Sequence, residues 1–545
     1  MLRQQALQQL HSQHVDVCII GGGATGAGCA LDAALRGLTV ALIEKNDFAS
    51  ATSSRSTKLV HGGVRYLEQA FKKLDWEQFQ MVRKGLHERA YMLNNAPHLA
   101  HPLALLTPTF RGFDTLYYGA GLKVYDWIAG DHNVESSQWL SKEESLQRIP
   151  TLKTDELHSA VLYYDGQFDD ARYNLALVKT AIEKGCMALN YASITAFGKD
   201  DNGKLQRATI QDELTGEQFS LTAKVFINAT GIFSDHIRQM ANAKAPSRMR
   251  VSKGVHLVLP QELLQSDTAI LVPKTNDGRV VFIIPWQGEL LVGTTDTEDE
   301  LSDQEPILLS EEVDYLLDYV NRYLAKPVTR AQVKSGFGGL RPLLQANPDA
   351  DTKALVRDHE VEVDETSGLL SIMGGKWTTY RAMAKDTIDA VYEQLSQPEV
   401  ACLTETQLLY GAEGYTPDLW KQLHESSGFS EAVCQHLCKK YGFEATKIIA
   451  LMQQKPALQQ LLAEGYAYVQ AEVVYAATQE MACTLRDVLA RRLGLELIDW
   501  KATERAIPVT AALMAECLGW TAAQTQEAQD NYLSLIRHFR EAAGL

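Results

Sequence analysis

Three glycines near the N-terminus have the spacing of a dinucleotide-binding turn. Gly21, Gly23 and Gly26 form a G-x-G-x-x-G pattern after an apolar run, and Glu44 follows Gly26 by 18 positions. In this pattern the first glycine allows a tight turn, the second lets the backbone approach a pyrophosphate, and the third lets helix and strand pack closely. A carboxylate about 20 residues further on accepts hydrogen bonds from a ribose hydroxyl. These residues therefore predict dinucleotide binding rather than a purely structural turn.

The flanking segments have the order that this chemistry needs. The apolar run at 15–20 predicts a buried strand, the alanine-rich run at 24–36 predicts a helix, and residues 40–43 predict a second strand. The N-terminus of such a helix offers free N–H groups and a partial positive charge to phosphates. Only one such fingerprint occurs in the sequence, so we expect one bound dinucleotide rather than two.

Composition narrows the class of protein. The 545 residues include 52 basic and 68 acidic side chains, for a net charge of −16, so the chain lacks the basic footprint of a nucleic-acid-binding protein. Its eight cysteines form no C-x-x-C pair and no cluster with zinc-ligand spacing. We predict no metal site. Without an N-terminal apolar region or an apolar run of membrane-spanning length, the predicted location is the cytoplasm.

A segment rich in small hydroxyl residues follows Glu44. Residues 50–57 are dense in serine and threonine, and Arg55, Lys58, His61 and Arg65 are interleaved with them and with glycines. Serine and threonine compete for backbone hydrogen bonds, so the segment is a poor regular helix. It could be a solvated loop. The interleaved cations favour a loop that runs along a cofactor.

The run DFASATSSRSTKLVHGGVRYLEQ, at 47–69, closely resembles the signature of FAD-dependent glycerol-3-phosphate dehydrogenases, which belong to a larger group of flavin-dependent oxidases and dehydrogenases. The resemblance implies that FAD is the cofactor and that Glu44 binds its adenosine ribose. It implies that Arg65 and Tyr66 face the substrate. It also implies a set of residues that line the flavin, namely Thr52, Ser53, Lys58, Leu59, His61 and Gly62.

Later segments add further site residues by the same resemblance. Thr230 and Gly231 end an apolar strand and support the cofactor, as do Gly375, Lys376 and Trp377 in a turn before a predicted helix. That helix would direct its positive end toward the flavin ring. Cations from separate segments are brought to one pocket for the substrate, namely Arg65, Arg341, Arg357 and Lys376. His256, inside a strand-like run, is the candidate base.

The predicted fold class is α/β. A Rossmann-like FAD-binding domain spans 1–395 discontinuously, an antiparallel-sheet substrate domain is inserted at roughly 86–150 and 245–335, and an all-helical domain spans 400–545. Three arginines of the helical domain are predicted to pair with acids on a solvated face, namely Arg486, Arg491 and Arg492.

The function that the resemblance implies is oxidation of sn-glycerol 3-phosphate to dihydroxyacetone phosphate. In this hypothesis His256 takes the proton of the C2 hydroxyl, hydride passes to FAD, and Arg341 stabilises the developing alkoxide. Three alternatives stay open: an amino-acid or hydroxy-acid oxidase of the same fold, a flavin module that senses redox state, and a nicotinamide enzyme.

The electron acceptor and the partners are less defined by the sequence. Quinone or oxygen would accept the electrons. The aromatic-rich residues 98–132 fit either a core helix pair or a surface that enters a membrane interface. The second interpretation predicts a peripheral protein on the inner face of the cytoplasmic membrane. A homodimer stays open.

Overall fold

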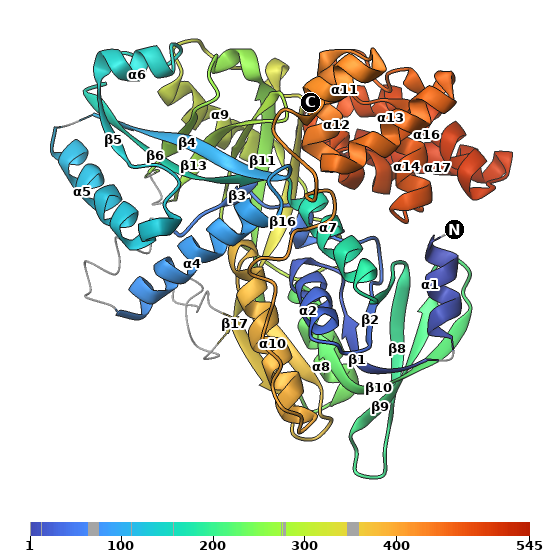
Figure 1. Cartoon of the computed structure of the whole chain (residues 1–545). Coiled ribbons are helices and arrows are strands. Elements are labelled where there is room, and N and C mark those ends of the chain that lie inside the picture. Colours follow the sequence, from blue (N-terminus) through green and yellow to red (C-terminus); the bar gives the residue numbers. More distant parts are fainter. Residues whose placement is uncertain are drawn as a thin grey trace.

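Figure 1 shows the computed structural model, with two sheet-containing lobes and a cluster of helices beside them. The structure describes residues 2–11, 13–63, 76–110, 112–155, 157–273, 275, 279–302, 304–345 and 359–545. Three residues predicted to bind the substrate lie outside these ranges, namely Arg65, Tyr66 and Arg357.

The first sheet carries the predicted dinucleotide-binding unit. Its strands follow the order β17-β18-β10-β1-β2-β7, and β1 runs parallel to both β10 and β2. Helix α2 (Ala24–Leu35) follows the glycine turn and packs between α7 (Asp170–Glu183) and α10 (Tyr380–Gln394). The strand bounds are β1 His14–Ile20, β2 Val40–Ile43, β7 Met187–Leu189, β10 Gln218–Asn228, β17 His359–Val363 and β18 Leu370–Gly374. Because β1, β2 and α2 are apolar and alanine-rich, they are buried as the sequence predicts.

A short antiparallel extension joins this sheet through β10. Strand β8 (Ala192–Lys199) pairs with β9 (Leu205–Asp212), and β9 pairs with β10. In Figure 1 the β8–β9 hairpin projects from the lower edge of the lobe, and helix α1 (Leu2–Leu10) lies beside the other end of these strands, where Arg3 donates to the Asp212 carboxylate. Strands β8, β9 and β10 therefore form a three-stranded antiparallel meander.

The second sheet is largely antiparallel and faces the first. Its order is β15-β11-β14-β13-β12-β4-β6-β3, with β16 against β11 and β5 against β6. Three of its strands depart from the ranges predicted for the inserted domain: β3 and β6 (Ser159–Phe168) lie outside them, and β16 (Ser335–Leu344) extends past them. The other bounds are β3 Leu59–Val60, β4 Ala100–Thr109, β5 Gln138–Ser141, β11 Met249–Pro260, β12 Ala269–Val272, β13 Val281–Trp286, β14 Glu289–Gly293 and β15 Thr297–Asp299.

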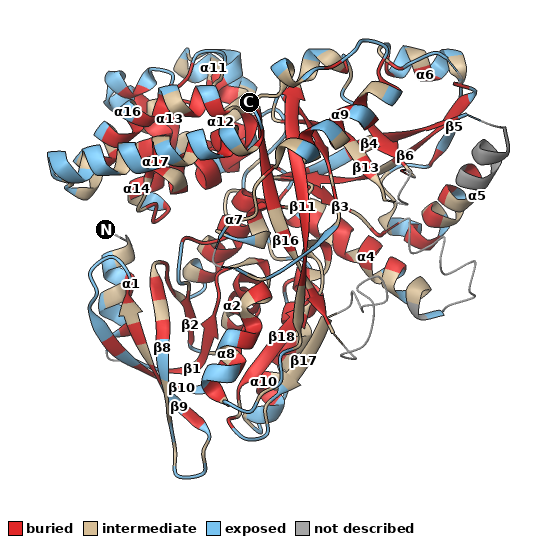
Figure 2. Cartoon of the chain, turned by 180° about the vertical axis from the view of Figure 1, so that it is seen from behind, coloured by how far each residue is buried: buried red, intermediate tan, exposed pale blue. Residues whose placement is uncertain are grey.

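Helices cover the second sheet. These are α4 (Trp76–Asn95), α5 (Gly112–Ala129), α6 (Lys142–Arg148) and α9 (Ser310–Tyr323). Figure 2 shows buried residues on the sides of the elements that face the sheets, and exposed residues on their outer sides. Among the described helices, none is long and apolar enough to cross a membrane.

The C-terminal domain is helical, as predicted. Its own core is built from apolar faces of several helices, and it adjoins the second sheet through α15 and β16. Its helices are α11 Leu419–Ser427, α12 Glu431–Tyr441, α13 Ala445–Gln454, α14 Gln470–Gln479, α15 Leu495–Ile498, α16 Trp500–Leu518 and α17 Ala522–Ala542. One turn of π-helix, Asp487–Arg492, precedes α15.

The prediction of a solvated face for the arginines of this domain is wrong. They do pair with acids, but Arg491 is 7% exposed and Arg492 is 1% exposed. Their partner is Asp47, in the loop after β2. Arg486 pairs with Glu496 and Glu305 beneath α17. The sequence pattern could not show this burial, because two of the acids, Asp47 and Glu305, come from distant segments.

Candidate functional site

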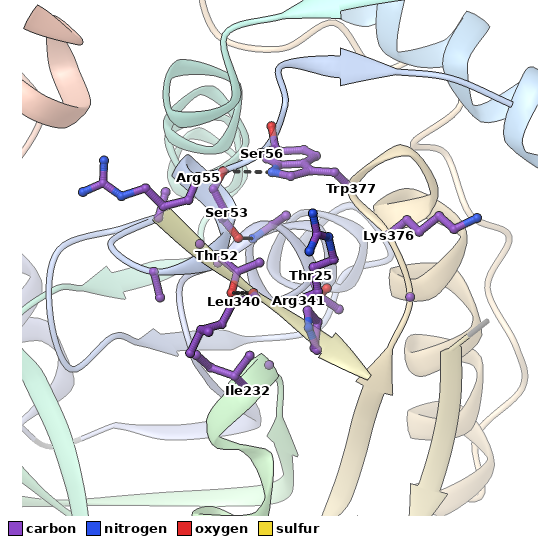
Figure 3. A pocket seen from close by; sticks show the side chains of 18 of the residues that line it. Thr25, Thr52, Ser53, Arg55, Ser56, Ile232, Leu340, Arg341, Lys376 and Trp377 are labelled. Atoms are coloured by element: carbon purple, nitrogen blue, oxygen red, sulfur yellow. Dashed lines mark hydrogen bonds between the residues drawn. The ribbon is translucent and has the colours of Figure 1, made fainter. Parts of the chain in front are cut away.

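A large cavity of about 1880 Å³ lies between the two sheets. Its walls are the glycine turn before α2, the end of β2, the hydroxyl-rich segment at 50–57, the end of β10 and the facing strands β11 and β16. The carboxyl ends of β1, β2 and β10 open onto it, which is where open α/β sheets bind ligands. Figure 3 shows Ser53, Thr52 and Leu340 along one wall, below Trp377.

The glycine turn leaves no room for side chains. Gly21 has φ +105°, and a Cβ there would lie 2.6 Å from the carbonyl oxygen of Ala229. A Cβ on Gly26 would lie 1.8 Å from the carbonyl oxygen of Gly21, so helix and turn touch through their backbones. Gly23 lines the cavity. All three glycines therefore meet the requirements predicted from their spacing.

Hydroxyl groups complete the N-terminus of α2. The Ser53 hydroxyl accepts a hydrogen bond from the Ala24 N–H at 2.9 Å, and the Thr52 hydroxyl donates to the Leu340 carbonyl at 2.8 Å. These bonds tie the hydroxyl-rich segment to both sheets. The segment runs along the cavity, so the cofactor-loop interpretation fits the structure better than the solvated loop does.

Glu44 ends β2 at the cavity wall. One carboxylate oxygen accepts the Gly22 N–H at 2.6 Å, and the other accepts the Asn46 N–H at 2.8 Å. Burial raises the pKa of Glu44, and the two N–H donors oppose that rise. Each oxygen retains acceptor capacity toward the cavity, which suits the ribose hydroxyls of a dinucleotide.

The residues predicted to line a flavin separate into two groups. Leu59 and His61 line the cavity, together with Thr52 and Ser53. Burial, followed by the charges of Lys376 and Arg89, lowers the pKa of His61 to about 4. Its imidazole is thus neutral at neutral pH.

Lys58 and Gly62 lie outside the cavity wall. Lys58 is fully buried, and its ammonium donates to Asp170 at 2.5 Å and to the Ser54 carbonyl at 2.8 Å. The Gly62 N–H donates to the Tyr125 hydroxyl at 2.8 Å. Neither Lys58 nor Gly62 directs its hydrogen-bonding group toward a cofactor, because the hydrogen-bond partners of both residues lie within the protein.

The turn after β18 supplies a further wall. Gly375 has φ +83°, and Lys376 and Trp377 both line the cavity. The Trp377 indole N–H donates to the Ser53 carbonyl at 2.9 Å, as drawn in Figure 3. A single 3-10 turn then leads into α10. The helix therefore begins at this wall, as predicted, and its positive end faces the cavity. Thr230 and Gly231, after β10, line the same space.

Arg341 and His256 lie on adjacent strands. Ser252 on β11 is opposite Arg341 on β16, and the Arg341 guanidinium bonds the Ser252 and Thr294 hydroxyls, at 3.3 and 3.0 Å, and the Thr295 carbonyl at 2.8 Å. It also contacts Asp296 at 3.3 Å. These contacts fix the guanidinium at the cavity wall.

His256 is buried at the same wall. Its Nε2 is 3.0 Å from the Thr57 hydroxyl, its ring stacks on Phe337, and its Nδ1 has no hydrogen-bond partner among the described residues. Burial, then the charges of Arg341 and Lys58, hold its pKa well below the usual value. The imidazole is therefore neutral and able to accept a proton. Sequence reasoning did not single out Thr57, although it belongs to the hydroxyl-rich run.

Comparison with known proteins agrees with this geometry. Residues 16–381 match the family of FAD-dependent oxidoreductases, and residues 402–525 match the C-terminal domain of alpha-glycerophosphate oxidase. The mitochondrial glycerol-3-phosphate dehydrogenase of Homo sapiens is 41% identical over 96% of this chain and 73% of its own length. The chain belongs to the FAD-dependent glycerol-3-phosphate dehydrogenase family. A probable mitochondrial glycerol-3-phosphate dehydrogenase of Caenorhabditis elegans is also 41% identical, over 95% of this chain and 72% of its own.

Solved structures place this member of the glycerol-3-phosphate dehydrogenase family in the same fold. The glycerol-3-phosphate dehydrogenase of Bacillus halodurans, complexed with FAD, superimposes with a TM-score of 0.81 at 30% identity, covering 100% of this chain and 99% of that one. L-alpha-glycerophosphate oxidase of Mycoplasma pneumoniae has a TM-score of 0.55 at 18% identity, covering 72% of this chain and 98% of that one. The latter likeness concerns the fold alone.

The residues present in this dehydrogenase fit FAD. The turn has glycines at positions where a Cβ would collide with neighbouring backbone, and the Glu44 carboxylate offers hydrogen-bond acceptors beside the turn. Gly375 and Trp377 shape the opposite wall. Among the residues that the structure describes, no cluster of histidine, cysteine and carboxylate side chains could hold a metal ion.

Proposed function

We propose that this chain oxidises sn-glycerol 3-phosphate to dihydroxyacetone phosphate at the wall formed by β11 and β16. One observation carries the proposal: the cavity that holds the dinucleotide turn is also lined by a fixed guanidinium, Arg341, and a neutral imidazole, His256. A carbinol oxidation needs these two groups, a proton acceptor and a cation for the developing oxyanion. FAD, when bound, supplies the hydride acceptor.

Each side chain has a separate task in this reaction. His256 takes the proton of the C2 hydroxyl, and the Thr57 hydroxyl orients its imidazole through Nε2. Arg341 stabilises the alkoxide that forms as this proton leaves, and it is pre-oriented by Thr294 and Thr295. Lys376, from the turn after β18, adds positive charge for the phosphate. Arg65, Tyr66 and Arg357 remain proposed substrate ligands outside the described residues.

Anaerobic mixing with sn-glycerol 3-phosphate tests this proposal. The absorbance band of oxidised flavin should bleach, and dihydroxyacetone phosphate should form in equal amount. Glycerol, which lacks the phosphate, and an L-amino acid or 2-hydroxy acid serve as controls and should leave the band unchanged. Bleaching by a carboxylate substrate instead would make the chain an amino-acid or hydroxy-acid oxidase.

We further propose that quinone is the electron acceptor and that the chain reaches it at a membrane surface. Three tryptophans of the second lobe are exposed, Trp76 by 68%, Trp127 by 74% and Trp139 by 54%. They belong to α4, α5 and β5, which lie together on one side of the molecule in Figure 1. Tryptophan at a surface suits a membrane interface, because its ring is amphipathic. The location that we propose is the inner face of the cytoplasmic membrane.

Sedimentation with vesicles tests the membrane contact. Substitution of Trp127 by serine should lower the bound fraction without changing the reduction of flavin by substrate in solution. Hydrogen peroxide formed in stoichiometric amount, with no stimulation by a water-soluble quinone, would identify oxygen as the acceptor instead. An unchanged bound fraction in the variant would refute the proposed surface.

A further inference from the structure

The loop after β2 is fixed from outside by the C-terminal domain. Asp47 in this loop is fully buried, and Arg492 binds it with two nitrogens, at 2.5 and 2.9 Å. Arg491 adds a third contact at 2.6 Å through Nε. The two arginines hold the pKa of Asp47 below its usual value, against the effect of burial. A buried carboxylate shared by two guanidinium groups is a strong and directional contact.

The arginines are themselves held in place. Arg491 also pairs with Asp487, one turn earlier in the π-helix, and Arg492 donates to the Glu480 carbonyl at 2.7 Å. The side-chain amide of Asn190, which follows β7, donates from Nδ2 to Asp47 Oδ1 at 3.3 Å. The contact therefore joins a rigid turn of the C-terminal domain to the edge of the first sheet, across about 445 residues of sequence.

The inner side of the same loop wraps around the glycine turn. The Glu44 carboxylate accepts the Gly22 N–H, and the Ala49 N–H donates to the Gly22 carbonyl at 3.2 Å. A Cβ on Gly22 would lie 2.7 Å from the Phe48 ring. Both backbone groups of Gly22, the middle residue of the turn, are thus bonded by the loop that carries Asp47. The loop also lines the cavity at Glu44, Lys45, Asn46, Ala49 and Ser50.

The backbone of this loop is strained. Ala49 has φ +60°, a left-handed conformation that is unfavourable for a non-glycine residue. Such a conformation persists only where its surroundings hold it. Asp47 lies two residues before Ala49, and its carbonyl accepts the Ser50 N–H at 3.1 Å. The bonds from Arg491 and Arg492 to Asp47 therefore oppose relaxation of the strained segment.

We propose that Asp47 is a positioning residue through which the C-terminal domain sets the affinity of the cavity for FAD. Asp47 itself does not line the cavity; it acts through Glu44 and through the Gly22 backbone. The inference rests on the proposed function in one respect, that FAD occupies this cavity. Without the two guanidinium contacts, the loop relaxes at Ala49 and the carboxylate of Glu44 leaves the wall.

The substitution Asp47→Asn tests this role, because it keeps the side-chain shape and removes the charge. Holoenzyme is diluted at 20 °C, and the fluorescence of released FAD reports the dissociation constant. We expect the FAD dissociation constant of the variant to be roughly tenfold or more above that of the wild type. This is the size of effect that outer-shell partners have on the affinity for bound metals. Arg492→Lys keeps the charge but not the bidentate geometry, so its FAD dissociation constant should lie between those of the wild type and Asp47→Asn.

A matched control separates positioning from general destabilisation. Glu88 is buried and receives two bonds from Arg381, and neither residue lines the cavity. Glu88→Gln should therefore lower the melting temperature without changing the FAD dissociation constant. If Asp47→Asn does not fold, Arg492→Lys carries the test. An Arg492→Lys or Asp47→Asn variant that melts earlier but holds FAD as tightly as the wild type would overturn the proposal. A wild-type protein that binds no FAD would instead overturn the proposed function.

Discussion

A methyl group on Gly26 should disrupt the dinucleotide site. In the native structure, a Cβ at this position would lie 1.8 Å from the Gly21 carbonyl oxygen, whereas ordinary contact begins at 3.4 Å. The substitution Gly26→Ala therefore displaces α2 from the turn by about 1.6 Å, the difference of these distances. The colliding atom belongs to the backbone, so no side-chain rotation can relieve it.

Two free-energy terms of Gly26→Ala have opposite signs, and the cost of the collision is larger than the gain in helix propensity. Alanine in place of glycine favours a helix by about 1 kcal/mol, while overpacking costs about 1–3 kcal/mol and more where the backbone must move. The displacement also breaks the bond from the Ala24 N–H to Ser53 and moves the helix N-terminus away from the phosphates. We expect FAD affinity to fall about a hundredfold, which corresponds to about 2.8 kcal/mol.

Two further glycines of helices give a graded comparison. A Cβ on Gly28 would lie 2.9 Å from the Tyr380 ring, a side chain that can shift, and a Cβ on Gly121 would meet no atom of the described residues within 4 Å. The ratio of flavin to protein absorbance after purification, and the melting temperature, should fall most for Gly26→Ala, less for Gly28→Ala, and not at all for Gly121→Ala. Full flavin content in purified Gly26→Ala protein would refute the reasoning.

Three other substitutions test the cavity wall and its support. Arg341→Lys loses the fixed fork, so KM for glycerol 3-phosphate should rise by roughly 10- to 150-fold, the equivalent of one charge-assisted hydrogen bond of about 1.5–3 kcal/mol, as steady-state kinetics would show. His256→Asn should slow anaerobic flavin reduction by about 10²–10⁴. The pKa of His256 is lowered, and its neutral form is the base. The rate of flavin reduction by the wild type should therefore stay constant from pH 8 to 6.5 and decline only below pH 6.5. A decline centred at pH 6.5 or above would contradict the assignment of His256 as the base. Lys58→Met leaves the buried Asp170 carboxylate without its cationic partner, so urea unfolding should show a free energy of unfolding lower by about 3–5 kcal/mol. A changed flavin spectrum with native stability would instead support direct contact of Lys58 with the cofactor.

The local elements followed from the sequence because their causes are local. The strand at 40–43 matches β2, and the helix at 24–36 matches α2 to within one residue. Apolar runs, glycine spacing and helix caps act over a few positions, so a single sequence displays them. The same holds for Glu44, which ends its strand wherever the sheet is placed.

The second sheet was only partly predictable. Strands β11, β13 and β14 lie in the range 245–335 predicted for an antiparallel sheet, but β6 and β16 join the sheet by pairing with strands that are remote in sequence. The family resemblance brought Arg341 and His256 to one pocket without a geometric reason. The register of β11 against β16 supplies that reason, since it places both residues on neighbouring strands at the cavity.

What the sequence determined by itself was the chemistry available: a backbone turn for a pyrophosphate, a carboxylate for a ribose, and cations for an anionic substrate. Only the tertiary structure decided which charges serve the cavity and which serve the fold. Lys58 and Arg492 carry the same sign as Arg341, yet they are buried against Asp170 and Asp47. A charge far from solvent needs an opposite charge nearby, and that partner is chosen by packing between segments more than a hundred residues apart.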